Sequence, residues 1–154
     1  ATQPEQSELL YESALLAEKL GRHEAMEASL RKLIRLKPEH AHAYNALGYS
    51  FAERNQRLEE AEQLVVKALQ LSPDDPFIID SMGWVLYRKG DNQGALTHLQ
   101  RAFSIRPDPE IAAHLGEVLW ALGRRDEAKR IWQEAAKAHP GNEVLAEVIK
   151  RFAP

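Results

Sequence analysis

The chain has 154 residues, of which 44% are apolar and 28% are charged, with a net charge of −3 and no cysteine. These values are typical of a soluble folded chain, and they exclude disulfides and thiolate metal sites. They provide no basic field that would attract nucleic acid or anionic lipid. Because no apolar run reaches the roughly 18–20 residues that a membrane-spanning helix needs, we expect no direct membrane insertion of this segment.

A sequence pattern recurs about every 34 residues. Gly48, Gly83 and Gly116 each lie inside an apolar stretch with helical spacing, and they are 35 and 33 residues apart. Each glycine is followed by an alanine in a second helical stretch, and each unit closes on a proline (Ala61, Ala95 and Ala128; Pro73, Pro107 and Pro140). Periods of this size predict stacked pairs of helices.

In chain order, the pattern predicts four helix–turn–helix units and a last helix. The units cover residues 7–40, 41–75, 76–108 and 109–142, and the last helix covers 143–154. In the first unit, Ala14 and Met26 replace the glycine and the first alanine of the pattern. The apolar residues of the last helix are expected to cover the exposed edge of the fourth unit as a cap.

Turn and capping residues lie between these helices. Gly21, Gly90 and Gly123, with Asn55 in the second unit, are placed to end each first helix in a left-handed conformation. Asp75 and Asp108 precede prolines, and Asn142 precedes the last helix, so these three side chains are expected to cap helix N-termini.

The repeated residues resemble those of tetratricopeptide repeats over nearly the whole chain. The second unit carries the family's series as Tyr44, Leu47, Gly48, Phe51, Ala61, Val65, Ala68 and Pro73, and the next two units carry matching series. The resemblance implies an all-α tetratricopeptide (TPR) solenoid, a single domain over residues 1–154 with four repeats and a C-terminal capping helix. It also implies a protein- or peptide-binding scaffold or adaptor, with no enzymatic activity.

The C-terminal part, from GWVLYRKGD through GEVLWALGRRDEAKRIW, is similar to the last repeats of bacterial outer-membrane TPR lipoproteins. Those proteins serve as scaffolds for other envelope proteins. This resemblance implies a bacterial, periplasmic protein that is tethered to the outer membrane through an N-terminal lipid anchor outside this segment. A cytoplasmic location is the alternative.

Each first helix has two stripes when residues are counted from its glycine. One stripe is apolar and is expected to join the paired helices. The other stripe mixes aromatic and polar residues, as protein interfaces do. In tetratricopeptide superhelices this second face lines the concave groove. The expected groove residues are Asn45, Tyr49, Glu53, Phe77, Asp80, Trp84, Tyr87, Arg88, Glu117 and Trp120.

Two interpretations of the aromatic residues stay open at this point. Trp84 follows its glycine directly, so it either lines the groove or wedges against the next first helix, whereas Trp132 is expected in the core. Acidic groups outnumber Arg88 on the expected groove face. A protein or peptide ligand with apolar and basic side chains therefore suits the face better than an acidic tail.

The sequence contains no recognisable catalytic, metal-binding or cofactor-binding motif. None of the six histidines takes part in a metal-ligand spacing, and the pair His114 and Glu117 is typical of surface neighbours on a helix. We therefore expect no catalytic residue, no metal site and no cofactor. The alternative to a binding scaffold is a structural module that self-associates into homo-oligomers or forms part of a longer solenoid.

Overall fold

The computed structural model describes residues 2–154, and over this range it contains nine α-helices and no strand. These helices form two compact units, one that ends at Pro73 and one that covers Asp74–Pro154. The expected all-α TPR fold is confirmed, whereas the assignment of the repeats to a single domain stays a prediction. In the described range, each helix is too short or too polar to cross a membrane.

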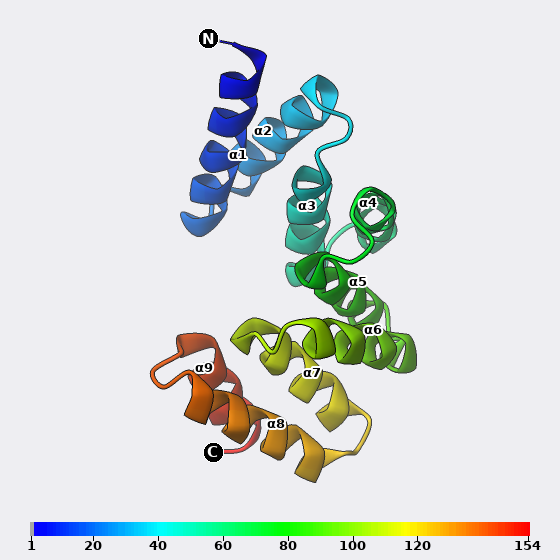
Figure 1. The fold of residues 1–154 in the computed structure, drawn as a ribbon, viewed down its shortest axis with the longest axis vertical. Coiled ribbons are helices and arrows are strands. Elements are labelled where there is room, and N and C mark those ends of the chain that lie inside the picture. The colour runs from blue at the N-terminus through cyan, green and yellow to red at the C-terminus, as the bar shows by residue number, and fades with distance from the viewer. Residues whose placement is uncertain (1) are drawn as a thin grey trace. The chain divides into compact units, whose positions relative to one another are not determined.

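Unit 1 consists of two antiparallel helix pairs (Figure 1). Helix α1 (Gln3–Lys19) packs on α2 (His23–Leu36), and α3 (Ala41–Glu53) packs on α4 (Leu58–Leu71). The replacements in the first repeat do not prevent packing, because Ala14 and Met26 are both buried. Contacts between α2 and α3 join the two pairs.

Unit 2 has two further pairs and a last helix. Helix α5 (Pro76–Arg88) packs on α6 (Asn92–Ile105), and α7 (Pro109–Ala121) packs on α8 (Arg125–Ala138). The last helix, α9 (Glu143–Phe152), contacts both α7 and α8. Its Leu145 and Val148 are buried in the core of this unit, as expected of a cap.

The glycines in the first helices lie where the paired helix comes closest. A Cβ atom added at Gly83 would lie 2.8 Å from Cγ of Leu99 and 3.2 Å from the carbonyl oxygen of Ala95. At Gly116 an added Cβ would collide with the indole ring of Trp132. A helix interior loses stability with glycine, so close helix packing is the compensating gain at these positions.

The expected turns and caps are also present. Gly90 between α5 and α6 has φ +93°, and in unit 1 Asn55 adopts the left-handed conformation with φ 54°. The side chains of Asp75 and Asp108 accept hydrogen bonds from backbone N–H groups in the first turns of α5 and α7. Asn142 caps α9 in the same way through the N–H of Leu145, at 3.0 Å. Local sequence signals therefore fix most helix ends.

Candidate functional site

Three expected groove residues lie on α3 in unit 1. Asn45 and Tyr49 are half-buried, and Glu53 is exposed. The side-chain oxygen of Asn45 is buried, and within the described part of the chain it has no hydrogen-bond partner. This part of the expected groove is therefore accessible at Glu53 and more enclosed at Asn45.

The other seven expected residues belong to unit 2, with five on α5 and two on α7. Asp80 and Trp84 are only 5% and 4% exposed. The expectation that these two side chains line an open groove is therefore wrong for the structure, and the wedge interpretation of Trp84 holds. The physical reason is His114 on α7, which covers both of them.

His114 links the two helices by a hydrogen bond and by stacking. Its Nδ1 atom lies 2.9 and 3.1 Å from the two carboxylate oxygens of Asp80. Its ring stacks on Trp84, with centroids 4.1 Å apart and planes 23° apart. Because a buried carboxylate needs a hydrogen-bonding partner, this arrangement satisfies Asp80 and also fixes the distance between α5 and α7. It is a structural connection beneath the candidate site.

Sequence reasoning did not find this pair. It considered His114 together with Glu117, whereas the structure pairs His114 with Asp80 and Glu117 with Arg151. Both observed pairs are 34 residues apart, which is one repeat length. The repeat period could have predicted both pairs, because residues one period apart lie at equivalent positions of neighbouring repeats.

Above this connection, Tyr87 and Glu117 meet at the surface. Arg151 on α9 donates a hydrogen bond to Glu117 at 2.5 Å, and the Glu117 side chain is only 12% exposed. The pKa of Tyr87 is raised, first because burial disfavours the phenolate. The negative charge of Glu117 and the hydrogen bond that its carboxylate accepts from the phenol raise this pKa further. These contacts place a neutral phenol and a carboxylate side by side.

Trp120 lies apart from this pair, in a ring cluster at the end of α7. Its ring centroid is 5.9 Å from that of Trp132 and 5.8 Å from that of Phe152. The guanidinium of Arg125 lies 4.9 Å from the Trp120 ring centroid. Trp132 is fully buried, which confirms its expected place in the core. Trp120 is half-buried and packs on this core, so only part of its ring is available to a ligand.

Phe77 and Arg88 lie at opposite ends of α5. Phe77 is 39% exposed, and the guanidinium of Arg106 lies 5.5 Å from its ring centroid. Arg88 is half-buried, and its guanidinium lies 5.6 Å from the ring centroid of Trp84. The structure thus brings Trp84, Tyr87, Arg88 and Glu117 together, with Asp80 linked to Trp84 through His114. It leaves Phe77 and Trp120 outside this set.

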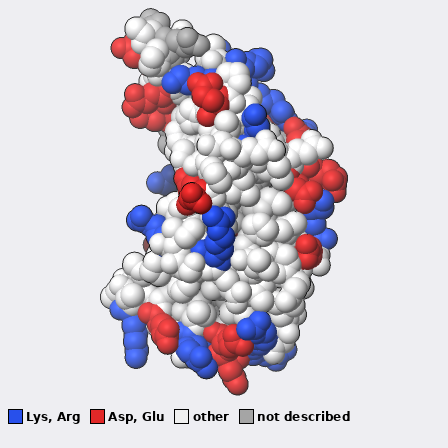
Figure 2. All heavy atoms as spheres, turned by 45° about the vertical axis from the view of Figure 1, so that its right-hand side comes forward, with Lys and Arg blue, Asp and Glu red and all other residues white. Residues whose placement is uncertain are grey.

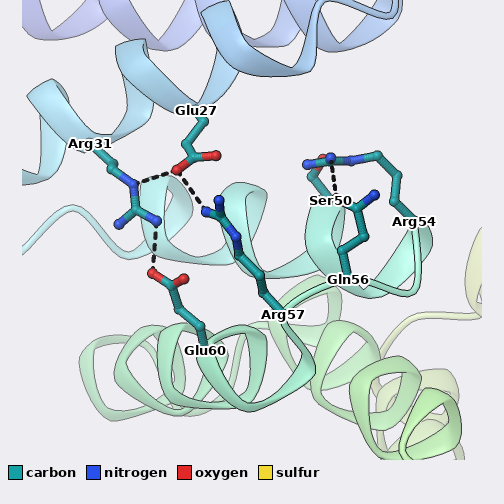
Figure 3. A network of polar contacts seen from close by, with 7 residues as sticks. All are labelled: Glu27, Arg31, Ser50, Arg54, Gln56, Arg57 and Glu60. Carbon is teal, nitrogen blue, oxygen red and sulfur yellow. Dashed lines mark hydrogen bonds and ion pairs between the residues drawn. The ribbon is translucent and has the colours of Figure 1, made fainter.

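A polar network in unit 1 was also absent from the sequence predictions. Arg31 on α2 donates to Glu27 and to Glu60 on α4, both at 2.8 Å, and Arg57 donates to Glu27 at 3.0 Å (Figure 3). A second set nearby joins Ser50 and Arg54. The contacts of Arg31 and Arg57 join α2 to α4 and to its N-cap residue, so they hold neighbouring repeats together.

The distribution of charged and metal-binding side chains indicates which kinds of ligand the site suits. Basic and acidic side chains are intermixed on the face drawn in Figure 2, which has no extended field of one sign. Among the described residues, no group of three or more His, Asp or Glu side chains is placed to hold a metal ion. The observed side chains suit recognition by rings, hydrogen bonds and single charges.

Two family models for the tetratricopeptide repeat match the chain, over residues 11–76 and 86–150. The chain belongs to the tetratricopeptide repeat family. A TPR repeat-containing protein of Pseudomonas aeruginosa is 49% identical over 114 residues, which are 74% of this chain and 19% of that relative. This chain therefore matches only about a fifth of the length of that relative.

Solved structures show the same fold at low sequence identity. A TPR protein of Thermus thermophilus has a TM-score of 0.83 and 24% identity, over 97% of this chain and 81% of its own. Pseudomonas aeruginosa pilF has a TM-score of 0.79 and 20% identity, over 97% and 70%. An O-GlcNAc transferase of Thermobaculum terrenum reaches 0.82 and 22%, over 90% of this chain and 27% of its own. These likenesses concern the fold alone.

Proposed function

We propose that this chain binds a protein or peptide through the concave groove expected of first helices in TPR proteins. Proteins with this fold are in general non-enzymatic scaffolds for protein interactions. The observation that carries the proposal is the surface set of Tyr87, Arg88 and Glu117 on α5 and α7. It combines an aromatic side chain with charges of both signs on a rigid pair of helices. We propose no catalytic activity.

The chemistry of this set favours a ligand with basic and apolar side chains. Glu117 is only 12% exposed and accepts a hydrogen bond from the Arg151 guanidinium, so a positively charged group can pair with its carboxylate. Tyr87 offers a ring with only two rotatable torsions, so it loses little conformational entropy on binding. An acidic ligand would be repelled by Glu117, whose carboxylate would stay unpaired if Arg151 were displaced.

Selection from a random peptide library displayed on phage would test the proposal without a known partner. We expect the protein to enrich peptides that contain Arg or Lys beside apolar residues. The double variant Tyr87→Ala with Glu117→Gln should bind the selected peptides at least about tenfold more weakly, a loss of about 1.4 kcal/mol. A matched double variant on the second helices, Gln100→Ala with Gln133→Ala, should bind them as the original does. Equal binding by both variants would move the site elsewhere.

A specific observation favours self-association as the second candidate function. Leu9 and Leu16 lie on one side of α1, Leu20 is the C-cap residue that follows the helix, and each of the three is about 60% exposed. Exposed apolar stripes of this kind are typical of helix interfaces. Light scattering at about 100 µM should then give the mass of a dimer that Leu16→Glu returns to a monomer. A monomeric mass for the original chain would reject this candidate.

The periplasmic location and lipid anchor stay predictions from the resemblance.

A further inference from the structure

The two side chains of the Glu117–Arg151 ion pair differ in their exposure to solvent. Glu117 lies on α7 with only 12% of its side chain exposed, whereas the Arg151 side chain on α9 is 54% exposed. The carboxylate has thus lost most of its water, and the guanidinium has kept about half of its own surface in solvent. A carboxylate in this position is stabilised by a cation, but nothing in its surroundings requires that cation to come from this chain.

The remaining surroundings of Glu117 suit a guanidinium in particular. The Tyr87 phenol lies beside the same carboxylate, and Arg151 approaches it from α9. The guanidinium of Arg151 also lies 4.7 Å from the ring centroid of Phe152. A planar guanidinium can bind a carboxylate and rest on an aromatic ring at the same time, whereas an ammonium group acts as a compact point charge.

Displacement of Arg151 requires little rearrangement of the fold. Arg151 is in the last turn of α9, whose attachment to unit 2 depends on Leu145 and Val148 in the core. The Arg151 side chain is more than half exposed, and holding its long chain in one geometry costs conformational entropy. An arginine from a bound peptide could therefore take the place of Arg151 while α9 stays packed.

We propose that Glu117 and Tyr87 form a recognition site for an arginine side chain of a bound peptide, and that Arg151 occupies this site in the free protein as an internal competitor. This inference rests on the proposed function and names the ligand group that the face recognises. Because Arg151 is tethered beside the site, it competes at a high effective concentration, on the order of millimolar. Peptide affinity in the free protein is lowered by that competition.

The test uses acetyl-Leu-Arg-Leu-amide and its citrulline counterpart, which has the same shape without the charge. Binding is followed by two-dimensional NMR of the nitrogen-15-labelled protein. Arg151→Gln should bind the arginine peptide at least about threefold more tightly than the original chain, with no gain for the citrulline peptide. Lys150→Gln removes one positive charge from the neighbouring position on α9, and it should leave the affinity unchanged. Glu117→Gln should reduce binding of the arginine peptide to the citrulline level.

Equal or weaker binding of the arginine peptide by Arg151→Gln would overturn the inference, because a competitor cannot support binding. If circular dichroism shows that this variant loses helix, Arg151→Lys replaces it and should give a smaller gain in the same direction. Failure of the inference differs from failure of the proposed function. Peptides selected on phage that lose affinity with Tyr87→Ala and Glu117→Gln, but whose affinity does not change with Arg151→Gln, would overturn only the inference. A selection that enriches no peptide would remove the proposed function.

Discussion

The two units connect their repeats with different chemistry. In unit 1, ion pairs join neighbouring helix pairs, with Arg31 contacting Glu60 at 2.8 Å and Arg57 contacting Glu27 at 3.0 Å (Figure 3). In unit 2, a stacked ring contributes as well, because His114 packs on Trp84 between α5 and α7 and also hydrogen-bonds Asp80. The same repeat pattern is therefore compatible with ion pairs or with stacked rings between neighbouring repeats. Ion pairs at the surface respond to salt, whereas stacked and buried rings respond to changes in volume.

The residues that cap the helix N-termini also differ between the two units. In unit 2, carboxylate and amide side chains cap four of the five helices, among them Asp75, Asp108 and Asn142, whereas α8 has no side-chain cap. In unit 1, His40 caps α3 by accepting the N–H of Ala43 at 3.0 Å, and Arg57 precedes α4 without a side-chain cap. An imidazole acceptor is lost when the ring is protonated, so this cap depends on pH near neutrality.

The largest effect is expected from Gly116→Val in unit 2. The new side chain would collide with the indole of Trp132, and overpacking of this kind costs about 1–3 kcal/mol. Hydrogen exchange should show faster exchange over Asp74–Pro154, with little change in unit 1. Gly48→Val should reverse this pattern, because its Cβ would lie 2.7 Å from Cγ2 of Val65. Ala138→Val at the exposed end of α8 is the control. Equal thermal midpoints of Gly116→Val and this control would show that the glycine has no packing role.

A smaller loss is expected from Phe152→Ala, which removes one ring from the cluster of Trp120 and Trp132. Because Phe152 is half-buried, we expect about 1–2 kcal/mol, below the 3–5 kcal/mol of a fully buried phenylalanine. Urea unfolding should show this loss in 0.1 M and in 1 M NaCl alike. Val144→Ala on the same helix removes an exposed side chain and should have little effect. A loss that disappears in high salt would contradict an apolar role for the cluster.

A double-mutant cycle of Arg31→Ala and Glu60→Ala should give a coupling of about 0.5–1 kcal/mol, because both side chains are about a third exposed and solvent screens them. In 1 M NaCl, where the Debye length is about 3 Å, the coupling should shrink. Urea is the suitable denaturant, since it adds no charge. The same cycle on Arg101 and Asp74 in unit 2 is the comparison, and it should give almost no coupling because Asp74 is 89% exposed. A coupling at Arg31 that salt leaves unchanged would disprove the contrast between the units.

The smallest effect concerns the His40 cap. Its pKa is lowered, first by burial and then by the charges of His42 and Lys37. A lowered pKa means that the unfolded chain binds the proton more readily, so the cap stabilises unit 1 above about pH 6.5 and this contribution is lost as the pH falls toward the folded-state pKa. His40→Asn keeps a capping oxygen that does not titrate. Its stability should therefore decline less than that of the original chain between pH 7 and 5, by some tenths of a kcal/mol. Parallel profiles would show that the cap does not titrate in this range.

Much of this molecule followed from the sequence alone. The 34-residue period placed the paired helices, and Gly83 and Gly116 marked the closest approaches because only a residue without a side chain fits there. The left-handed turn at Gly90 and the cap at Asp75 followed from local backbone chemistry. These features depend on a residue's own conformation or on one neighbouring helix, so a local pattern is sufficient to predict them.

The accessible part of the candidate site was decided only by tertiary structure. The stripe on α5 contained Asp80, Trp84 and Tyr87. The sequence left two positions open for Trp84 and did not distinguish Asp80 from Tyr87. His114 from the next repeat buries the first two and leaves Tyr87 beside Glu117. Arg151 on the last helix reaches Glu117 one full repeat away. Burial and pairing depend on which side chain the neighbouring repeat contributes and where it points, and a period in the sequence specifies the neighbour without specifying that direction.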